Sequence, residues 1–323
     1  ATISRNGDLV HRMYLEIDTD ASLLDDEGDD NYGHSLIDNV ELEIGGQKID
    51  KHYGHWMETW AELTEPNPTG AKAVTSASDG TKFQRMALAG GADISYTAGA
   101  LKIWVPLQFW FCRNPGLALP LIALQYHEVK VVLTHQTWDN INGPSTPTSN
   151  KLFCDYIYLD TDERRRFAQV SHEYLIEQVQ FETKTGGGSM DLNFNHPVKE
   201  LIWTGVATRD TGYSTPIAAG TGTYQLKLNG HDRFAARDYR YFTRTQVWEH
   251  HTGYGGVTVP DSIAVYSFAL KPEEHQPSGT CNFSRIDNAQ LVEDGSTTPI
   301  NVYAVNYNVL RIMSGMGGLA YSN

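Results

Sequence analysis

Four side chains that could bind a metal ion lie close together near the start of the chain. They are His52, His55, Glu58 and Glu62. Asp50 can cap a helix here, and the apolar residues recur at helical spacing at Tyr53, Trp56, Met57 and Trp60. We therefore expect a short amphipathic helix with an aromatic stripe against a β-sandwich. No cysteine or third histidine completes a metal motif, so a solvated helix face is preferred over a metal site.

An acidic run at residues 18–31 could form a calcium loop. Its carboxylates are Asp18, Asp20, Asp25, Asp26, Glu27, Asp29 and Asp30. A helix-loop-helix calcium site needs acidic residues at alternate positions, a central glycine and a closing glutamate between two helices. Here the spacing is irregular and the flanking patterns predict strands. A solvated acidic loop is the preferred interpretation.

Two further runs have residue types that bind phosphate. Arg164, Arg165 and Arg166 follow Asp160, Asp162 and Glu163, which favours a neutralised linker or an inter-subunit contact. The run of Gly186, Gly187 and Gly188 lacks the lysine and hydroxyl residue of a phosphate-binding loop, so no nucleotide is assigned. The pairs His250-His251 and His172-Glu173 are interpreted as surface or interface residues.

No catalytic motif is present. The sequence contains no G-x-S-x-G, H-E-x-x-H or C-x-x-C, and no G-x-G-x-x-G after a predicted strand. The sequence does not decide whether a carboxylate pair for glycoside cleavage is present, because the distance between the two groups in the fold defines such a pair. We expect no catalytic residue, no cofactor and no metal. Asn282 begins the only N-x-S/T acceptor without proline, and chance occurrence is favoured over glycosylation there.

Composition narrows the class of protein. At 323 residues the chain exceeds what one hydrophobic core usually supports, so two domains are expected. The 29 glycines, 13 prolines and 11% aromatic residues suit many strands joined by tight turns. A net charge of -14 argues against binding nucleic acid phosphates or an anionic membrane. Cys112, Cys154 and Cys281 are interpreted as reduced core residues, which indicates synthesis in a reducing compartment.

The elements that must position these residues are mostly strands. Residues 105–133 form the organising stretch, with a predicted strand, a turn at Pro115-Gly116 and a second strand. Its bulky rings need a second sheet to cover them. Residues 65–101 are too long for a hairpin loop and predict a surface excursion. Residues 160–170 predict a connector between domains, and no apolar run reaches the ~20 residues that span a bilayer.

Part of the sequence repeats. The strand at residues 41–44 with the turn Gly45-Gly46 corresponds to residues 225–228 with Asn229-Gly230, and an aromatic helical segment follows each. Further on, a turn ending at Pro120 is matched with one ending at Pro277. Two similar all-β domains that arose by duplication fit this order. Gly45, Gly46 and Gly230 are expected to serve turns with positive φ, so valine there should impair assembly through misfolding.

Seven segments closely resemble the major capsid protein of nucleocytoplasmic large DNA viruses. The similarity is nearest to the algal phycodnavirus branch, with mimivirus relatives next, and covers nearly the whole chain. The segments are ISRNGDLV (3–10), VELEIGGQKIDKHY (40–53), PGLALPLIALQYHEVKV (115–131), HEYLIEQVQF (172–181), LNFNHPVK (192–199), YSFALKPEEHQPSGTCNFSRIDNA (266–289) and NYNVLRIMSGMGGLAYSN (306–323).

The resemblance implies an all-β fold of two tandem eight-stranded antiparallel jelly-roll β-sandwiches with short helices in loops. The first would span residues 1–162, a connector 163–173, and the second 174–323. Three chains would form a homotrimeric capsomer of pseudo-sixfold outline. These capsomers would contact neighbouring capsomers and minor capsid proteins in the icosahedral shell of the virion, without direct nucleic acid contact. The chain would be made in the host cytoplasm, and the loop 65–101 would point outward, where glycans sit in some members.

The sequence departs from the family in two places. It lacks the arm and first strand expected before Ala1, and the stretch between residues 289 and 300 is shorter than usual. That arm would carry inner contacts, including proximity to an inner membrane. The alternative from another class of function is a secreted carbohydrate-binding or glycoside-processing β-sandwich protein. It would require a signal peptide upstream and an aromatic-lined groove with two carboxylates.

Overall fold

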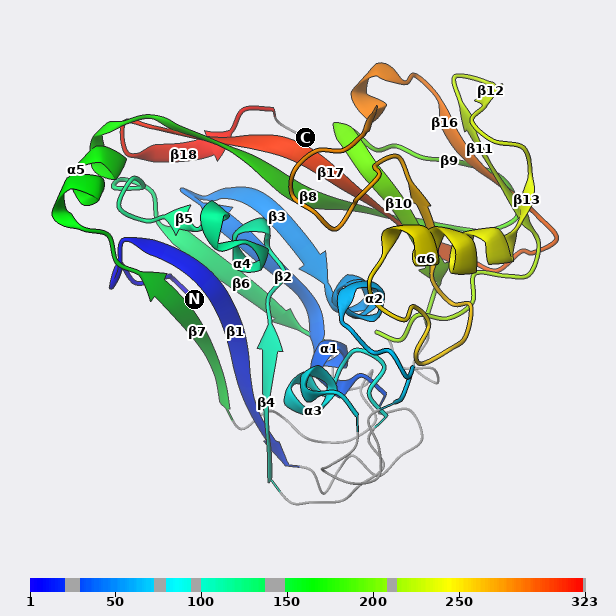
Figure 1. Cartoon of the computed structure of the whole chain (residues 1–323), viewed down its shortest axis with the longest axis horizontal. Coiled ribbons are helices and arrows are strands. Elements are labelled where there is room, and N and C mark those ends of the chain that lie inside the picture. The colour runs from blue at the N-terminus through cyan, green and yellow to red at the C-terminus, as the bar shows by residue number, and fades with distance from the viewer. Residues whose placement is uncertain (21–29, 73–79, 94–99, 137–148, 208–213, 322–323) are drawn as a thin grey trace.

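The structure, a computed structural model, describes residues 1–20, 30–72, 80–93, 100–136, 149–207 and 214–321 (Figure 1). Every strand pairing among them is antiparallel. The strands form two groups along the chain, β1 to β7 and β8 to β18, which we call the first and second halves. No helix in the described ranges is both long and apolar enough to cross a membrane.

The first half contains two facing sheets. Its strands are β1 (Leu9–Asp20), β2 (Ile37–Ile44), β3 (Gln47–Tyr53), β4 (Ala100–Pro106), β5 (Leu119–Pro120), β6 (Val129–His135) and β7 (Ser149–Ile157). One sheet centres on β1, with β4 and β5 along one edge and β7 along the other, and the second has the order β3-β2-β6. Alternate residues of β1 and β2, such as Leu15 and Leu42, face each other in the buried core.

The second half repeats this plan with additional strands. Its strands are β8 (His172–Lys184), β9 (Gly188–Asp191), β10 (Pro197–Gly205), β11 (Thr223–Leu228), β12 (His231–Asp232), β13 (Arg237–Asp238), β14 (Ala264–Ser267), β15 (Cys281–Asn282), β16 (Ala289–Asp294), β17 (Ile300–Met313) and β18 (Met316–Leu319). One sheet has the order β14-β10-β17-β18, with β15 on β10 and β8 on β17, and the other has the order β12-β11-β16-β9. Trp203 and Leu226 lie in the core between them.

Short helices occupy the connections between strands. They are α1 (Tyr32–Ser35), α2 (Gly54–Thr64), α3 (Lys82–Ala87), α4 (Trp110–Arg113), η2 (Pro115–Leu117), α5 (Thr161–Gln169), the π-helical turn η5 (Tyr241–Thr245), α6 (Gln246–His250) and η6 (Phe283–Arg285). Each half is therefore a jelly-roll sandwich with short helices in its loops, and the predicted fold class is confirmed. The described residues form seven strands in the first half and eleven in the second.

The internal repeat is visible in the strand pairing. Around β1 lie β4, β5 and β7, and in the same places around β10 lie β14, β15 and β17. Each central strand has one bulge, next to Val10 in β1 and next to Val198 in β10. The other sheets match too, because Leu42 pairs with Val131 as Leu226 pairs with Leu291. The correspondence predicted between residues 41–44 and 225–228 is confirmed.

The register corrects one part of the predicted repeat. Pro120 pairs with Leu9 in the first half, and the same position in the second half is taken by Asn282, which pairs with Pro197. Pro277 lies in the exposed loop before β15. The turns after β4 and β14 differ in length, so a proline in each was a misleading marker.

The stretch 105–133 also differs from the prediction. The chain leaves β4 at Pro106, and residues 110–113 form the helical turn α4, so the expected strand through Phe111 is wrong. Phe109, Trp110 and Phe111 are buried on all sides, and such a run has no alternation to separate strand from helix. The second predicted strand begins only at Val129. In the excursion 65–101, residues 73–79 and 94–99 lie outside the described ranges, as do residues 21–29 of the acidic run.

The connector is helical. Asp160 caps α5, because its Oδ1 accepts hydrogen bonds from the backbone N–H groups of Asp162 and Glu163 at 3.0 and 2.9 Å. The Nε of Arg164 donates to Oδ1 of the buried Asp8 at 2.8 Å. At least this arginine is neutralised within the chain, as expected of a linker.

The two halves pack against each other through a continuous apolar core. Residues of the second half, among them Ile176, Ile202 and Ile312, belong to the same buried cluster as the core of the first half. Figure 1 shows α2 where the two halves meet. This junction holds most of the buried charged side chains described below.

Candidate functional site

The residues with metal-ligand chemistry around α2 do not face solvent. His52, His55, Glu58 and Glu62 are each at most 9% exposed, so the expected solvated helix face is wrong. One side of α2 is covered by the turn at Gly90 and Gly91, and the other by the second half. The sequence pattern showed an amphipathic helix but could not show that a second layer covers its polar side.

His52 and His55 are held by separate partners. His52 Nε2 lies 2.8 Å from Oδ2 of Asp50, and its ring stacks on Phe109 with centroids 4.7 Å apart. His55 Nδ1 lies 2.7 Å from the hydroxyl of Tyr303 in β17, and its Nε2 lies 3.3 Å from Oγ1 of Thr204 in β10. Burial lowers the pKa of His55 to about 4, so the ring is neutral at pH 7.

Glu58 and Glu62 hold two loops against α2 by hydrogen bonds. Glu58 accepts the backbone N–H groups of Gly90 and Gly91 at 3.0 and 2.7 Å and lies 2.5 Å from Nδ1 of His34. Glu62 accepts the N–H of Val257 and the hydroxyl of Thr258, both at 2.8 Å. Burial, together with the charge of Glu58, raises the pKa of Glu62 to about 8.

This arrangement does not provide a metal site. The carboxylates are already occupied by backbone N–H groups, and the described part of the chain contains no group of three or more His, Cys, Asp or Glu side chains placed to share an ion. The glutamates of α2 therefore stabilise the fold. Their side chains replace water as acceptors for buried N–H donors.

A second charged cluster lies beside α4. Glu177 of β8 accepts from the guanidinium of Arg113 and, at 2.7 Å, from the ammonium of Lys199, which is fully buried. Burial opposes the charge of Glu177, but Arg113, His275 and Lys199 outweigh it and hold the pKa of this carboxyl well below its ordinary value. Burial lowers the pKa of Lys199, so its ammonium depends on Glu177.

A third cluster surrounds His251, which is buried at the junction. Its Nε2 lies 3.1 Å from Oε2 of Glu200, and its Nδ1 lies 3.0 Å from Oε1 of Glu273. Burial favours the neutral ring, but the two carboxylates outweigh it and raise the pKa of His251 to about 9. The interpretation of His251 as an interface residue agrees with this position. His172 and Glu173 begin β8, where Glu173 pairs with Arg311 at 2.8 Å.

The Glu177 and Glu200 clusters are not predicted by the sequence patterns described above. A signal was present in β10, where Lys199 and Glu200 interrupt an otherwise apolar strand. Charged residues within such a run need buried partners, because an isolated charge in a core is costly. Which partners they find depends on β8 and on the loop at Glu273, and the sequence does not show that contact.

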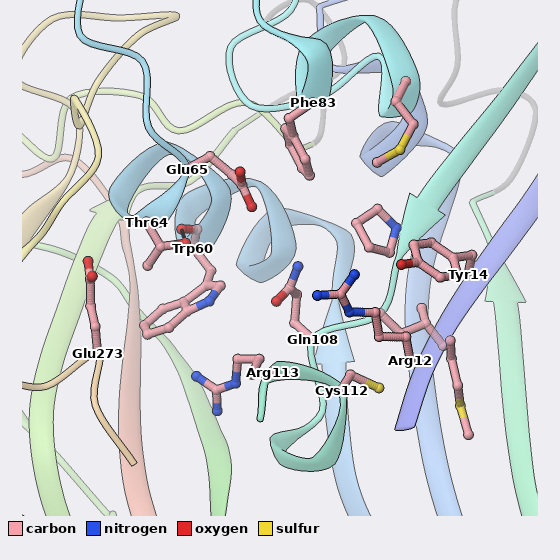
Figure 2. A pocket seen from close by; sticks show the side chains of 14 residues that line it. Arg12, Tyr14, Trp60, Thr64, Glu65, Phe83, Gln108, Cys112, Arg113 and Glu273 are labelled. Atoms are coloured by element: carbon pink, nitrogen blue, oxygen red, sulfur yellow. Dashed lines mark hydrogen bonds between the residues drawn. The ribbon is translucent and has the colours of Figure 1, made fainter. Parts of the chain in front are cut away.

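Figure 2 shows a cavity of about 390 Å³ on this junction. Its labelled lining includes Arg12, Tyr14, Trp60, Thr64, Glu65, Phe83, Gln108, Cys112, Arg113 and Glu273. The guanidinium of Arg113 lies over the Trp60 ring, 5.1 Å from its centroid. Burial raises the pKa of the Cys112 thiol to about 12, which leaves it protonated and a poor nucleophile. No lining nucleophile of the described chain is paired with a base.

The three cysteines are free thiols. Cys112 is buried, while Cys154 and Cys281 are half-buried. The prediction of unpaired cysteines agrees with this. Burial raises the pKa of the Cys154 thiol to about 11, so it too stays protonated at neutral pH.

The predicted turn residues lie in two hairpins that repeat between the halves. Gly45, Gly46 and Gly230 have φ values of 60°, 80° and 77°, and Asn229 has φ 52°. The side chain of Asn229 also accepts from the N–H groups at residues 287 and 288, at 2.9 and 3.1 Å. Asn282 is half-buried, and its side chain accepts from the N–H of Ser284 at 3.1 Å.

Comparisons with known proteins agree with one another. Residues 1–160 match the family described as major capsid protein N-terminus, and residues 163–318 match the family described as large eukaryotic DNA virus major capsid protein. The major capsid protein of Pyramimonas orientalis virus is 50% identical, with 99% of this chain and 85% of that protein covered. The major capsid protein of Paramecium bursaria Chlorella virus 1 is 40% identical, with 99% and 86% covered.

Solved structures give the same result. A chain of the PBCV-1 virus capsid superposes with a TM-score of 0.81 at 38% identity, covering 100% of this chain and 92% of that one. The Faustovirus major capsid protein superposes with a TM-score of 0.65 at 12% identity, covering 97% and 87%. The second likeness, at this identity, concerns the fold alone.

Proposed function

Since the chain belongs to the family of large eukaryotic DNA virus major capsid proteins, we propose that it assembles as a homotrimer with a nearly hexagonal outline. The chain is a structural protein of the capsid shell of the virion. Three copies with two jelly rolls each present six similar units, and six similar units around an axis approximate a hexagon that can tile a flat facet.

The observation that carries this proposal is the repeat within the chain. The same strands surround β1 and β10, with a bulge at the same position in each. A single jelly roll would not give six units from three chains. We take the first jelly roll as residues 1–162, the connector as 163–173 and the second as 174–323. The boundary between the two family matches, at residues 160 and 163, supports this division.

The chain is further proposed to have no catalytic activity. The buried carboxylates and histidines at the junction are engaged with backbone N–H groups, hydroxyls and cations, and the Cys112 thiol is protonated. Groups that are satisfied and buried in this way hold a fold together and offer little to a substrate. Neighbouring capsomers and minor capsid proteins are the proposed partners. The net charge of -14 supports the proposal that the chain does not bind nucleic acid directly.

Sedimentation velocity of the purified chain tests the trimer. At micromolar concentration we expect a species of about 108 kDa, three times the 36.0 kDa chain. A single species of 36.0 kDa across this range would overturn the proposal. A 72 kDa species, twice the chain mass, would also overturn it, because two copies give four jelly rolls and no hexagon.

A further inference from the structure

The sheet of the first half that contains β1 has an aromatic outer face. Residues on the two sides of a strand alternate, so Leu15 and Val105 point into the core while their neighbours point away. Tyr14, Trp104, Pro106 and Phe153 are the apolar residues among those that point away, and we call them the outer sheet face; the charged Glu16, Lys102 and Lys151 point to the same side. Trp104 is 38% exposed and Phe153 is 49% exposed. Large rings exposed on one face of a sheet are typical of an interaction site.

The equivalent face of the second half is covered. Val10 pairs with Tyr156, and Val198 pairs with Asn306, immediately before the two bulges. Counting along the strands from these pairs gives the equivalent positions: Tyr14 with Ile202, Glu16 with Thr204, Pro106 with Val265, and Phe153 with Tyr303. In the second half all four of these residues have no exposed surface.

What covers that face is the helix and sheet of the first half. The Tyr303 ring contacts Trp56 of α2 with centroids 5.1 Å apart, and Thr204 Oγ1 lies 3.3 Å from His55 of the same helix. Beside them, Phe181 of β8 contacts Tyr53 of β3 at 4.7 Å. Within the chain, therefore, helix α2, which follows the hairpin of β2 and β3, packs against the outer face of the second jelly roll.

The second half has its own helix after the equivalent hairpin. The turn η5 and helix α6 follow β11, β12 and β13 as α2 follows β2 and β3. Three exposed residues recur every four positions along this segment, Arg240, Arg244 and Trp248, and we call them the arginine–tryptophan row. Trp248 is 81% exposed. Tryptophan and arginine are the side chains that most often dominate protein interfaces.

We propose that the arginine–tryptophan row of one copy docks on the outer sheet face of a second copy of this chain. This repeats between copies the contact that α2 makes within one copy, and it rests on the proposed homotrimer. In Figure 1, α6 and the strands β1 and β7 lie on opposite sides of the molecule, so one copy cannot bring its own two surfaces together. Three such head-to-tail contacts close a ring.

Glu16 gives the contact a polar component. It occupies the position of Thr204, which meets His55 in the contact within the chain. Its carboxylate already accepts from the Trp104 indole at 3.0 Å and lies 3.4 Å from Lys102 Nζ. A carboxylate beside the exposed Trp104 ring suits an approaching arginine, which stacks on aromatic rings and binds carboxylates.

The test compares single variants of the trimer by sedimentation velocity. Trp248→Ala and Phe153→Ala should each raise the concentration at which trimers dissociate by at least tenfold, because each removes a large ring from the contact. Tyr126→Ala is the matched control. It also removes an exposed ring, which is 76% exposed, but from the loop before β6, and its trimers should persist. Both ring residues are exposed, so circular dichroism should show unchanged folding.

Crosslinking gives a second measurement. Single variants Trp248→Cys and Phe153→Cys, treated with a short bismaleimide, should give linked chains when mixed and only the wild-type background when treated alone. Stable trimers of both alanine variants with no crosslink in the mixture would overturn this interface and leave the homotrimer standing. A wild-type chain that sediments only as monomer would overturn the proposed function itself.

Discussion

His55 and Tyr303 are joined by a buried hydrogen bond, 2.7 Å long, that crosses from the first jelly roll to the second. The hydroxyl of Thr204 donates to the carbonyl of Gly205, so it can only accept from Nε2 of His55. His55 therefore carries its proton on Nε2, and Nδ1 accepts from the Tyr303 hydroxyl. The low pKa of the ring, about 4, keeps this tautomer neutral.

Tyr303→Phe should destabilise the chain by about 1 to 3 kcal/mol, because it leaves Nδ1 of His55 buried without a donor. The free energy of unfolding from urea titration at fixed protein concentration measures this. Tyr158→Phe is the control. Tyr158 is 69% exposed, so removal of its hydroxyl should leave stability unchanged. Equal stability of the two variants would show that the bond across the junction contributes nothing.

Glu177→Gln should cost about 3 to 5 kcal/mol of stability, since it leaves the buried Lys199 without its carboxylate. The matched control is Glu274→Gln, which removes a carboxylate paired with Lys271 at 2.9 Å on the surface. Thermal unfolding should show a clear loss for the first variant and no change for the second. A similar midpoint for both would mean that Lys199 finds another partner or loses its proton at little cost.

His251→Gln should flatten the dependence of stability on alkaline pH. The folded pKa of about 9 lies above the ordinary 6.5, so protonated His251 contributes stability that is fully present below pH 6.5 and lost as pH rises through 9. The wild-type thermal midpoint should therefore fall between pH 6.5 and 9, and that of the variant should fall less. Parallel curves would contradict the assignment of this fall to His251.

Glu62→Gln should change a different part of the same pH curve. The pKa of Glu62 is about 8 in the folded chain against an ordinary 4.5, so the folded state holds the proton more tightly. Its contribution to stability declines from pH 4.5 to 8 and is constant above that. The variant should have a shallower slope between pH 5 and 8 and keep the wild-type fall above pH 8. If the Glu62→Gln variant no longer lost stability above pH 8, that decrease in the wild type would be due to Glu62 and not to His251.

Gly45→Ala should impair folding more than Gly46→Ala. Both glycines have positive φ, where an L side chain costs roughly 1 to 2 kcal/mol. A Cβ at Gly45 would also lie 2.3 Å from Nδ1 of His127, while a Cβ at Gly46 meets nothing within 4 Å. Yield of soluble, folded chain and the thermal midpoint measure the difference. Equal losses would show that the backbone conformation alone matters in this turn.

The parts of the fold that the sequence predicts well are set by local chemistry. The hairpins at Gly45-Gly46 and Asn229-Gly230 follow from residues that accept positive φ between alternating strands. The matched hairpins indicated the duplication because the same local pattern occurs twice in the same order. The pairing of Leu42 with Val131 and of Leu226 with Leu291 shows that this local pattern extends to the sheets.

The parts that could not be predicted depend on contacts between distant segments. Glu58 and Glu62 appear solvent-facing in the sequence because it does not show that the loops at Gly91 and Val257 cover them. Phe109 and Trp110 appear to continue a strand because a residue buried on all sides leaves no periodicity. The clusters around Glu177 and His251 needed the packing of the two halves, and no local pattern encodes it.

The shared core also has a consequence for the order of events during synthesis. The junction face of the first half is fully buried only when residues such as Tyr303 and Ile312 are present, and the ribosome adds these about 150 residues after β7 is complete. At roughly 5 to 20 residues per second, this delay is on the order of ten seconds. Throughout that interval the nascent chain carries the aromatic side of α2 uncovered, so aggregation and chaperone capture compete with completion of the fold at this face.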